Sequence, residues 1–193
     1  MTAPMLEPLG CALFLLAAFA LAGCAQAAWL GSAAARRFAW PIDGGRTLRG
    51  RRVFGGNKTA RGFIVMIPAT AAAFFMLSLA THPDAHGLWA LTPFQYAALG
   101  LLAGAGFMAG ELPNSFIKRQ LDIAPGRSAT GRLARPLSFV VDRVDSVLGA
   151  LAAIGSVMPV PWLTVVLVLL FGPVVHGLFS VLTFRLGGKE RPA

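Results

Sequence analysis

Residues 137–158 read LSFVVDRVDSVLGALAAIGSVM, an apolar stretch with Asp142 and Asp145 near its beginning. Two prolines, Pro159 and Pro161, follow directly after it. Because a membrane-spanning helix needs about 20 apolar residues, this stretch can cross a membrane only if both aspartates lie in its first turns. A charge at the bilayer centre costs at least ~2.5–3.5 kcal/mol, so ionisable residues within a span are candidate functional residues.

The chain as a whole has the composition of a polytopic membrane protein. Hydrophobic residues make up 56% of it and charged residues 13%, and its mean hydropathy is +0.67. Five stretches have the length and apolarity of a span, namely residues 9–31, 63–81, 91–112, 137–158 and 161–184. We therefore predict an all-α protein with five transmembrane helices in a single domain over residues 1–193. Its two longer loops are about residues 32–62 and 113–137.

The positive charges predict how the chain is oriented. All 17 lysines and arginines lie in the two longer loops, in the first turns of the fourth helix, or after the fifth span. Since Lys and Arg accumulate on the cytoplasmic side, we expect the N-terminus outside and both loops and the C-terminus in the cytoplasm. The predicted location is the cell (inner) membrane, crossed several times. Trp89 and Trp162 fall at the outer span ends, as in an aromatic belt.

The net charge of +9 is explained by the basic residues that set the membrane orientation and attract anionic membrane lipids. Nucleic-acid binding is excluded, because the basic loops lack interleaved aromatic residues and any known nucleic-acid-binding motif.

The first predicted cytoplasmic loop ends in Gly55-Gly56-Asn57-Lys58-Thr59, immediately before the second span. Glycines allow a backbone to approach a ligand closely. Lys58 and Thr59 offer a cation and a hydroxyl donor for phosphate oxygens. We favour ligand binding here over the alternative of a basic loop that follows lipid phosphates.

A second polar group continues out of the third span. Its members share one face of a helix, with spacing i, i+3, i+4 and i+7: Glu111, Asn114, Ser115 and Lys118. Pro113 lies among them and should kink the helix at the membrane edge, because it removes a backbone hydrogen bond.

Carboxylates in these two segments predict a magnesium site. Asp142 and Asp145 are three residues apart and share a helix face, and Glu111 is a third carboxylate close to the same membrane edge. Mg²⁺ prefers oxygen ligands and usually binds through one or two carboxylates plus substrate phosphates. The alternative is a set of structural ion pairs with Lys118, Arg119 or Arg143.

Two pairs of glycines in the third span, Gly100/Gly104 and Gly106/Gly110, have small-xxx-small spacing. Such pairs permit close helix packing, either within the bundle or across a homodimer.

Taken together, these motifs resemble a known enzyme family. The run Ser115-Phe116-Ile117-Lys118-Arg119, followed by Asp142-Arg143-Val144-Asp145-Ser146, is similar to the signature of CTP:phosphatidate cytidylyltransferases. The match is closer to the small five-span branch, CDP-archaeol synthase. That branch also has the motifs seen here at Pro41 to Gly45, Gly56 to Gly62 and Ser115 to Gly126. The resemblance covers about residues 40–150.

The resemblance implies transfer of CMP from CTP to a lipid phosphate, giving a CDP-lipid and pyrophosphate, with Mg²⁺ as cofactor. The acceptor would be an archaeal-type diether glycerophosphate or a phosphatidate-like lipid. Asp142 and Asp145, with Glu111, would bind the metal. Lys118 and Lys58 would contact the CTP phosphates.

Further roles follow from the same resemblance. Arg119 and Arg61 would hold the acceptor phosphate or the leaving group. Polar contacts to the nucleotide would come from Asn57, Thr59, Asn114 and Ser115.

Alternatives remain at this point. A CDP-alcohol phosphotransferase would need an Asp-Gly-x-x-Ala-Arg motif, which Asp43-Gly44-Gly45-Arg46-Thr47-Leu48 does not match. A transporter would carry charges along a path through the bundle rather than at one face. Glu111 stands where the family usually has aspartate, which leaves open a non-catalytic lipid-binding or accessory protein on the same fold.

Overall fold

The computed structural model describes residues 6–81, 87–125 and 134–185. It contains five α-helices in these ranges, which are α1 (Pro8–Gly31), α2 (Ala60–Thr81), α3 (Pro93–Gln120), α4 (Ala134–Gly155) and α5 (Trp162–Arg185). A short 3₁₀ helix, η1 (Ala34–Phe38), and the two-residue strands β1 (Thr47–Leu48) and β2 (Arg51–Arg52) connect α1 to α2. Each predicted span falls on one of the helices, so the all-α prediction is confirmed.

Side chains cap the N-termini of α1 and α3. The carboxylate of Glu7 accepts hydrogen bonds from the backbone N–H groups of Leu9 (3.2 Å) and Gly10, and Pro8 occupies the first helical turn of α1. At α3, Thr92 and Gln95 form a capping box, in which the Thr92 N–H donates to Gln95 Oε1 at 2.8 Å. These groups satisfy backbone donors that a helix leaves unpaired at its N-terminus.

Three of the described helices are long and apolar enough to cross a membrane: α1, α2 and residues Trp162–Phe179 of α5. The other two, α3 and α4, fall short of that measure. Helix α3 contains four glycines and α4 two, and both helices carry polar residues of the candidate site near one end. A chain that places a polar site inside a membrane bundle necessarily has less apolar helices around it.

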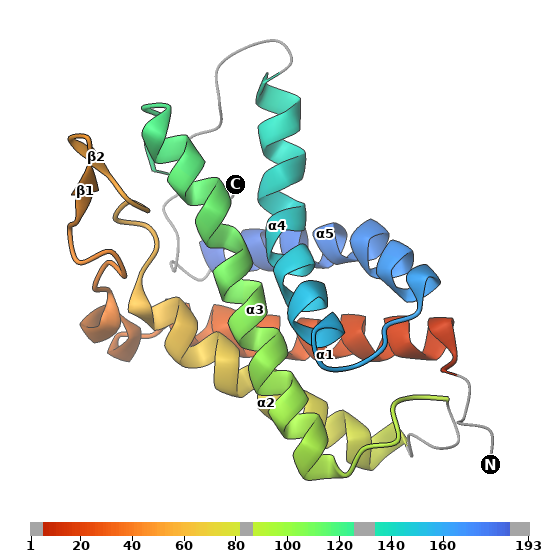
Figure 1. The fold of residues 1–193 in the computed structure, drawn as a ribbon. Helices are drawn as coiled ribbons and strands as arrows, with labels where there is room; N and C mark the ends of the chain where they lie inside the picture. The colour runs from red at the N-terminus through yellow and green to blue at the C-terminus, as the bar shows by residue number, and fades with distance from the viewer. Residues whose placement is uncertain (1–5, 82–86, 126–133, 186–193) are drawn as a thin grey trace.

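Glycines hold α3 closely between α2 and α4 (Figure 1). A Cβ atom on Gly100 would lie 2.7 Å from the Cα of Ala71 in α2. A Cβ atom on Gly110 would lie 2.9 Å from the Cα of Gly149 in α4. Both predicted glycine pairs therefore serve packing within the chain's own bundle.

The aromatic-belt prediction is wrong for Trp89. Its side chain is 1% exposed and its indole Nε1 donates to the backbone oxygen of Pro159 at 2.8 Å. The hydroxyl of Tyr96 donates to the backbone oxygen of Trp89 at 2.7 Å, and Phe14 packs against both rings. Trp89 thus closes the core at this end of the bundle, whereas Trp162 is 75% exposed, as a membrane-interface residue would be.

The segment over residues 113–137, predicted to lie between two spans, is helical at both of its ends, and its first part continues α3 as the spacing of Glu111, Asn114 and Lys118 predicts. Helix α3 continues through Pro113 as far as Gln120, and α4 already begins at Ala134. A proline inside a helix removes one backbone hydrogen bond; beyond Pro113, Asn114 and Lys118 both contact Asp142 of α4. Residues 126–133 of this loop lie outside the described residues.

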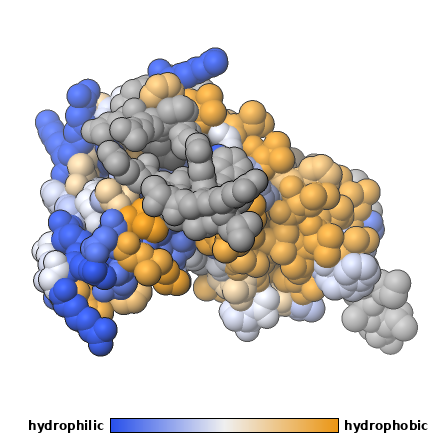
Figure 2. Space-filling view, turned by 90° about the horizontal axis from the view of Figure 1, so that it is seen from above, coloured by the Kyte–Doolittle hydropathy of each residue, from blue (hydrophilic) through white to orange (hydrophobic). Residues whose placement is uncertain are grey.

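The first loop contains a hairpin that the sequence reasoning did not predict. β1 and β2 pair antiparallel around a two-residue turn, Arg49-Gly50, in which both residues have positive φ (52° and 78°). Arg51 joins the hairpin to the end of α3, because its guanidinium donates to the backbone oxygen of Gln120 and to the carboxylate of Asp122 (2.5 Å). Figure 2 shows hydrophilic residues gathered on the left side of the molecule, where the hairpin lies in Figure 1, and a broad hydrophobic surface on the right side.

Candidate active site between α3, α4 and the first loop

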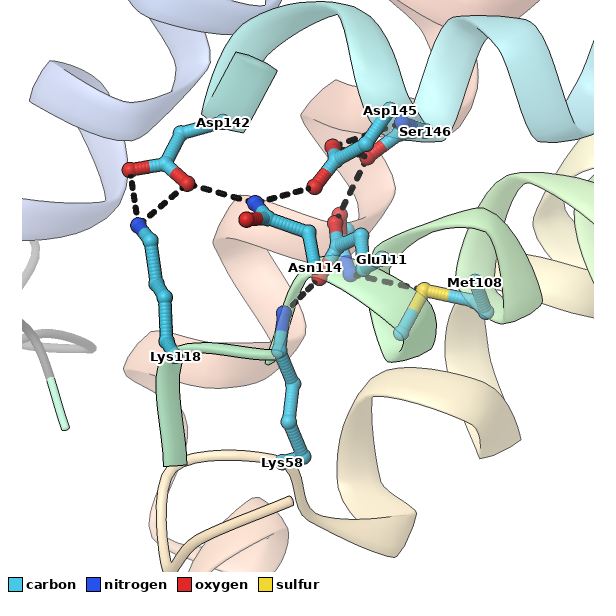
Figure 3. A network of polar contacts seen from close by, with 9 residues as sticks. Lys58, Met108, Glu111, Asn114, Lys118, Asp142, Asp145 and Ser146 are labelled. Carbon is cyan, nitrogen blue, oxygen red and sulfur yellow. Dashed lines mark hydrogen bonds and ion pairs between the residues drawn. The ribbon is translucent and has the colours of Figure 1, made fainter. Parts of the chain in front are cut away.

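Polar side chains from α3, α4 and the loop before α2 meet in one network (Figure 3). Helix α3 supplies Glu111, Asn114 and Lys118 from a single face, as the helical spacing predicts. Helix α4 supplies the aspartates from the face that packs on α3. The two helices can approach closely enough for these contacts because Gly110 and Gly149 have no side chains.

Asn114 stands between the two aspartates. Its Nδ2 donates to Asp142 Oδ1 at 2.6 Å and to Asp145 Oδ2 at 2.9 Å. Those two carboxylate oxygens are therefore within about 5.5 Å of each other, because both contact the same nitrogen. Lys118 Nζ donates to both oxygens of Asp142, at 2.5 Å to Oδ2, and its side chain is 13% exposed.

The loop before α2 reaches the same network through Lys58. Its Nζ forms an ion pair with Glu111 Oε2. Ser146 then joins Glu111 to Asp145, since its hydroxyl contacts Glu111 Oε1 at 2.8 Å and Asp145 Oδ1 at 3.3 Å. Lys58, predicted to bind the nucleotide, and Glu111 and Asp145, predicted to bind the metal, therefore lie in the same network.

Asp43 holds the loop that carries Lys58 in place. Its buried carboxylate accepts backbone hydrogen bonds from Gly45 (3.0 Å), Phe54 (3.1 Å) and Gly55 (3.0 Å), and an ion pair from Arg52 at 2.5 Å. The hydrogen-bonded Arg52 guanidinium and these N–H groups hold the pKa of Asp43 well below its usual range, although burial opposes them. The N–H of Ile42 donates to the backbone oxygen of Lys58 at 2.9 Å, which ties both ends of the loop together.

Arg119 is a buried cation beside this loop. It is 7% exposed, and its Nε and Nη1 have no hydrogen-bond partner among the described residues. A Cβ atom on Gly55 would lie 3.3 Å from Nη1, so this glycine leaves room for the guanidinium. Burial lowers the pKa of Arg119, because a cation away from water is destabilised. Burying a charged group with unpaired nitrogens is costly, so Arg119 is suited to receive an anion at Nε and Nη1.

Other predicted site residues do not enter the network. Asn57 is exposed at the surface of the loop. The backbone of Thr59 pairs with Pro41, and the backbone oxygen of Arg61 accepts a hydrogen bond from Trp29 Nε1 at 3.1 Å. Ser115 is buried at 8% exposure next to Asn114 on α3. The binding roles predicted for these four side chains remain predictions.

Two residues of the site were not singled out from the sequence. Ser146 follows Asp145 directly, and Asp43 lies in an Asp-Gly-Gly turn; both belong to the quoted family motifs. Asp-Gly is a turn signal, which could have indicated a carboxylate that bonds to nearby backbone N–H groups. The contact between Ser146 and Glu111 depends on how α3 packs on α4, and no local pattern reveals it.

The carboxylates of Glu111, Asp142 and Asp145 are suitable ligands for a divalent cation, but they are not arranged as a complete metal site. Among the described residues, no group of three or more His, Cys, Asp or Glu side chains is arranged to hold a metal ion. Asp145 has no ion pair in the part of the chain that the structure describes; it contacts the Asn114 amide together with the hydroxyl and N–H of Ser146. Mg²⁺ usually binds through one or two carboxylates plus substrate phosphates, and Asp142 and Asp145 offer such a pair.

The chain is similar to proteins of one known family. The family model described as CarS-like, CDP-archaeol synthase, matches residues 12–192. The chain is 37% identical to a CDP-archaeol synthase of Halobacterium salinarum over 161 residues, which cover 79% of this chain and 82% of that protein. It is 29% identical to a CDP-archaeol synthase of Methanocaldococcus jannaschii, over 78% of this chain and 81% of that protein.

A solved structure has a similar fold. It is described as "Structural insight into an intramembrane enzyme for archaeal membrane lipids biosynthesis", and it matches with a TM-score of 0.57 and 25% sequence identity. The match covers 81% of this chain and 89% of that one. On these matches and on the network described above, the chain belongs to the CDP-archaeol synthase family of CTP-dependent cytidylyltransferases.

Proposed function

We propose that the protein transfers CMP from CTP to an archaeal-type diether glycerophosphate, producing a CDP-lipid and pyrophosphate at the cytoplasmic face of the membrane. The observation that carries this proposal is the α3–α4 network. It combines three carboxylates, two lysines and a neighbouring buried arginine at the polar end of an otherwise apolar bundle. The names of the relatives support the diether acceptor over a phosphatidate.

The reaction exchanges one phosphorus–oxygen bond for another. An oxygen of the lipid phosphate attacks the α-phosphorus of CTP, and the bond from that phosphorus to the oxygen bridging to the β-phosphorus breaks. Catalysis of such transfers depends mainly on alignment and on stabilisation of the charge that develops on the leaving group. The protein therefore needs cations around the triphosphate more than it needs a covalent nucleophile.

Three cationic side chains are in position for this task. Lys58 and Lys118 are ion-paired with Glu111 and Asp142 in the structure described here, so they are held near the site before any substrate arrives. We assign them to the CTP phosphates, with Arg119 receiving the departing pyrophosphate or the acceptor phosphate. Asn114 keeps the two aspartates side by side.

The same family resemblance implies Mg²⁺, which would be held by Asp142 and Asp145, with Glu111 as the third carboxylate. Such an ion would neutralise charge on the phosphates and fix their position. The network has three carboxylates against two lysines, so it has a formal excess of one negative charge, which favours a bound cation. Glu111 and Asp142, which pair with Lys58 and Lys118 in this structure, would be available to the cation if the lysines paired with the CTP phosphates instead.

The first experiment asks which lipid is the acceptor. Purified protein in detergent is supplied with radiolabelled CTP and either a diether glycerophosphate or a diacyl phosphatidate, and the CDP-lipid is separated and counted. We expect a higher kcat/KM with the diether lipid and no product when EDTA removes divalent cations.

Equal turnover of the two lipids would contradict the acceptor assignment while leaving the reaction type intact. Turnover that persists in EDTA would contradict the metal assignment. A folded protein that makes no CDP-lipid from either acceptor would favour the non-catalytic alternative.

A further inference from the structure

Helix α1 carries one side-chain amide in an otherwise apolar sequence. Gln26 lies in the last two turns of this helix, and the other residues of Pro8–Gly31 are aliphatic, aromatic, Gly, Pro or Cys. Its side chain is half-buried. A polar side chain in a membrane helix is costly unless it finds hydrogen-bond partners, so the surroundings of Gln26 indicate its role.

The amide of Gln26 has a weak partner among the described residues. Its Nε2 contacts the thioether Sδ of Met108 in α3 at 4.0 Å. A thioether sulfur is a weak acceptor, whereas a primary amide can donate two hydrogen bonds and accept two. Gln often joins membrane helices by hydrogen bonds between them, but a sulfur contact at this distance is too weak to give Gln26 that role.

Neighbouring residues hold this amide where α1, α2 and α3 meet. One turn further along α1, Trp29 Nε1 donates to the backbone oxygen of Arg61 at 3.1 Å, which fixes α1 against the first turn of α2. The next residue of α2 is Gly62. A Cβ atom there would lie 3.9 Å from Gln26 Nε2 and 2.9 Å from Met108 Cε, so this glycine leaves room for both groups.

The amide meets α3 beside the carboxylate network, on the side away from the hairpin. Met108 precedes Glu111 by three residues, and side chains at this spacing are neighbours on a helix. Helix α3 runs toward the hairpin, which is bonded to its last residue, Gln120. At 1.5 Å per residue, Met108 is about 4.5 Å further from that polar end than Glu111 and about 15 Å further than Lys118. Figure 3 shows Lys118, Glu111 and Met108 in this order along the site.

The two substrates of the proposed reaction differ in what they can place at this level. CTP is soluble and reaches the network from the polar end. A lipid phosphate lies at the membrane surface, and its glycerol oxygens lie between the phosphate and the hydrocarbon chains. With the phosphate at the carboxylates, the glycerol oxygens are about one helical turn deeper, at the level of Gln26. Ether oxygens accept hydrogen bonds and donate none, so they match the N–H groups of an amide.

We propose that Gln26 is a specificity-determining residue for the lipid acceptor, and that its Nε2 donates to a glycerol ether oxygen in place of the Met108 sulfur. The proposal rests on the function proposed above, because it names the part of that reaction's lipid substrate that α1 recognises. The weak sulfur contact is readily exchanged for an oxygen acceptor, which forms a stronger hydrogen bond with the same N–H group.

The test compares two lipids on three proteins. The lipids are a dialkyl glycerophosphate and an analogue in which CH₂ replaces both ether oxygens, with the same phosphate and chains. The proteins are the unaltered chain, Gln26→Met, which keeps the side-chain length without the amide, and Leu21→Met, at a 48% exposed position of the same helix. Binding of each radiolabelled lipid in detergent micelles is measured without CTP, and binding of CTP with Mg²⁺ is measured without lipid.

We expect the unaltered protein and Leu21→Met to bind the dialkyl glycerophosphate about fivefold more tightly than the CH₂ analogue, as one net hydrogen bond would give. Gln26→Met should reduce this preference to less than twofold, while its affinity for CTP changes by less than twofold. Its Tm should not fall, because methionine is a flexible apolar side chain that can pack against Met108 without a poorly paired amide.

A preference for the dialkyl glycerophosphate that is equal in Gln26→Met and in the unaltered protein would overturn the proposal, as would the absence of any preference in the unaltered protein. Weaker CTP binding by Gln26→Met with unchanged lipid binding would assign the amide to the nucleotide instead. The binding measurements need no turnover, so they decide the role of Gln26 separately from the reaction. Failure of the folded, unaltered protein to bind either lipid would contradict the function proposed above as well.

Discussion

The buried charge of Arg119 is expected to lower the stability of the protein and to favour anion binding, and a single substitution can test both effects. Its guanidinium is buried, and two of its nitrogens have no partner among the described residues. A group like this is expected to destabilise the protein before ligand binds and to stabilise the complex with an anion.

We predict that Arg119→Met leaves the Tm unchanged or raises it, while it lowers kcat/KM at least 100-fold, or about 2.7 kcal/mol of transition-state stabilisation. Methionine fills a similar volume without a charge. Thermal unfolding in detergent and the CDP-lipid assay provide the two measurements. Arg46→Met, at an exposed position of the first loop, is the control. A clearly lower Tm with turnover retained would show that Arg119 has a structural role only.

Asp43 provides a prediction about pH. Its pKa is lowered in the folded protein, so its contribution to stability is present above the unfolded pKa of about 3.9 and is lost as the pH falls toward the folded value. Asp43→Asn should therefore reduce the free energy of unfolding at pH 7 by about 1–3 kcal/mol. The difference from the unaltered protein should shrink below about pH 4.

Thermal unfolding at pH 7 and pH 3 checks this expectation. Asp122→Asn is the matched control, because Asp122 is 67% exposed in its ion pair with Arg51 and such surface pairs contribute about 0–1 kcal/mol. The Tm of Asp43→Asn could instead lie equally far below that of the unaltered protein at both pH values. That result would show that the lost contacts do not depend on ionisation of Asp43.

The sequence predicted best those site residues that share one face of a helix. Helical periodicity placed Glu111, Asn114 and Lys118 together, and the structure confirms that they lie in one network. The burial of Arg119 was not predictable in this way. It depends on the loop at Gly55 folding over the end of α3, which is a contact between distant parts of the chain.

At the scale of whole elements, the packing of α3 on α4 decides whether the site exists. A Cβ atom on Gly149 would lie 2.7 Å from the Cα of Gly110, closer than real atoms pack. Gly149→Ala should therefore push α4 away from α3, lower stability by about 1–3 kcal/mol and reduce turnover. Gly155→Ala, in open space on the same helix, should be neutral or slightly stabilising, because alanine favours helix formation.

These two variants are compared by Tm and by kcat/KM under the same conditions. If Gly149→Ala kept full stability and activity, the helices would not need the close approach at this position.

Helix positions were predicted well and their ends less well. Long apolar stretches identify helices, whereas the end of α3 depends on polar contacts that form only after folding. The helical spacing of Glu111 to Lys118 predicted that α3 continues past Pro113, but not that it ends at Gln120. The hairpin at Arg51 was missed for a related reason, since its strands are only two residues long and are held by contacts with Gln120 and Asp122.

At the scale of the molecule, the number of spans and their orientation are open to direct measurement. We predict five spans, with the hairpin in the cytoplasm. In a background with Cys11 and Cys24 replaced by alanine, a cysteine at Arg49 should react with a membrane-impermeant maleimide only in inside-out vesicles. A cysteine at Ser156, between α4 and α5, should react only in right-side-out vesicles.

Labelling of both positions from the same side would contradict this topology. The glycine pairs also allowed a homodimer, but they give it no support, since Gly100 and Gly104 pack against α2 and Gly106 and Gly110 pack against α4 of the same chain.

The measurement that addresses the proposed mechanism most directly is pyrophosphate release from CTP, with lipid acceptor and Mg²⁺, by the unaltered protein and by three aspartate variants. Asp142→Asn and Asp145→Asn should each lower kcat at least 100-fold without loss of fold, whereas Asp122→Asn should keep the rate within twofold. Equal rates for the unaltered protein and both network variants would contradict the assignment of the α3–α4 network as the active site.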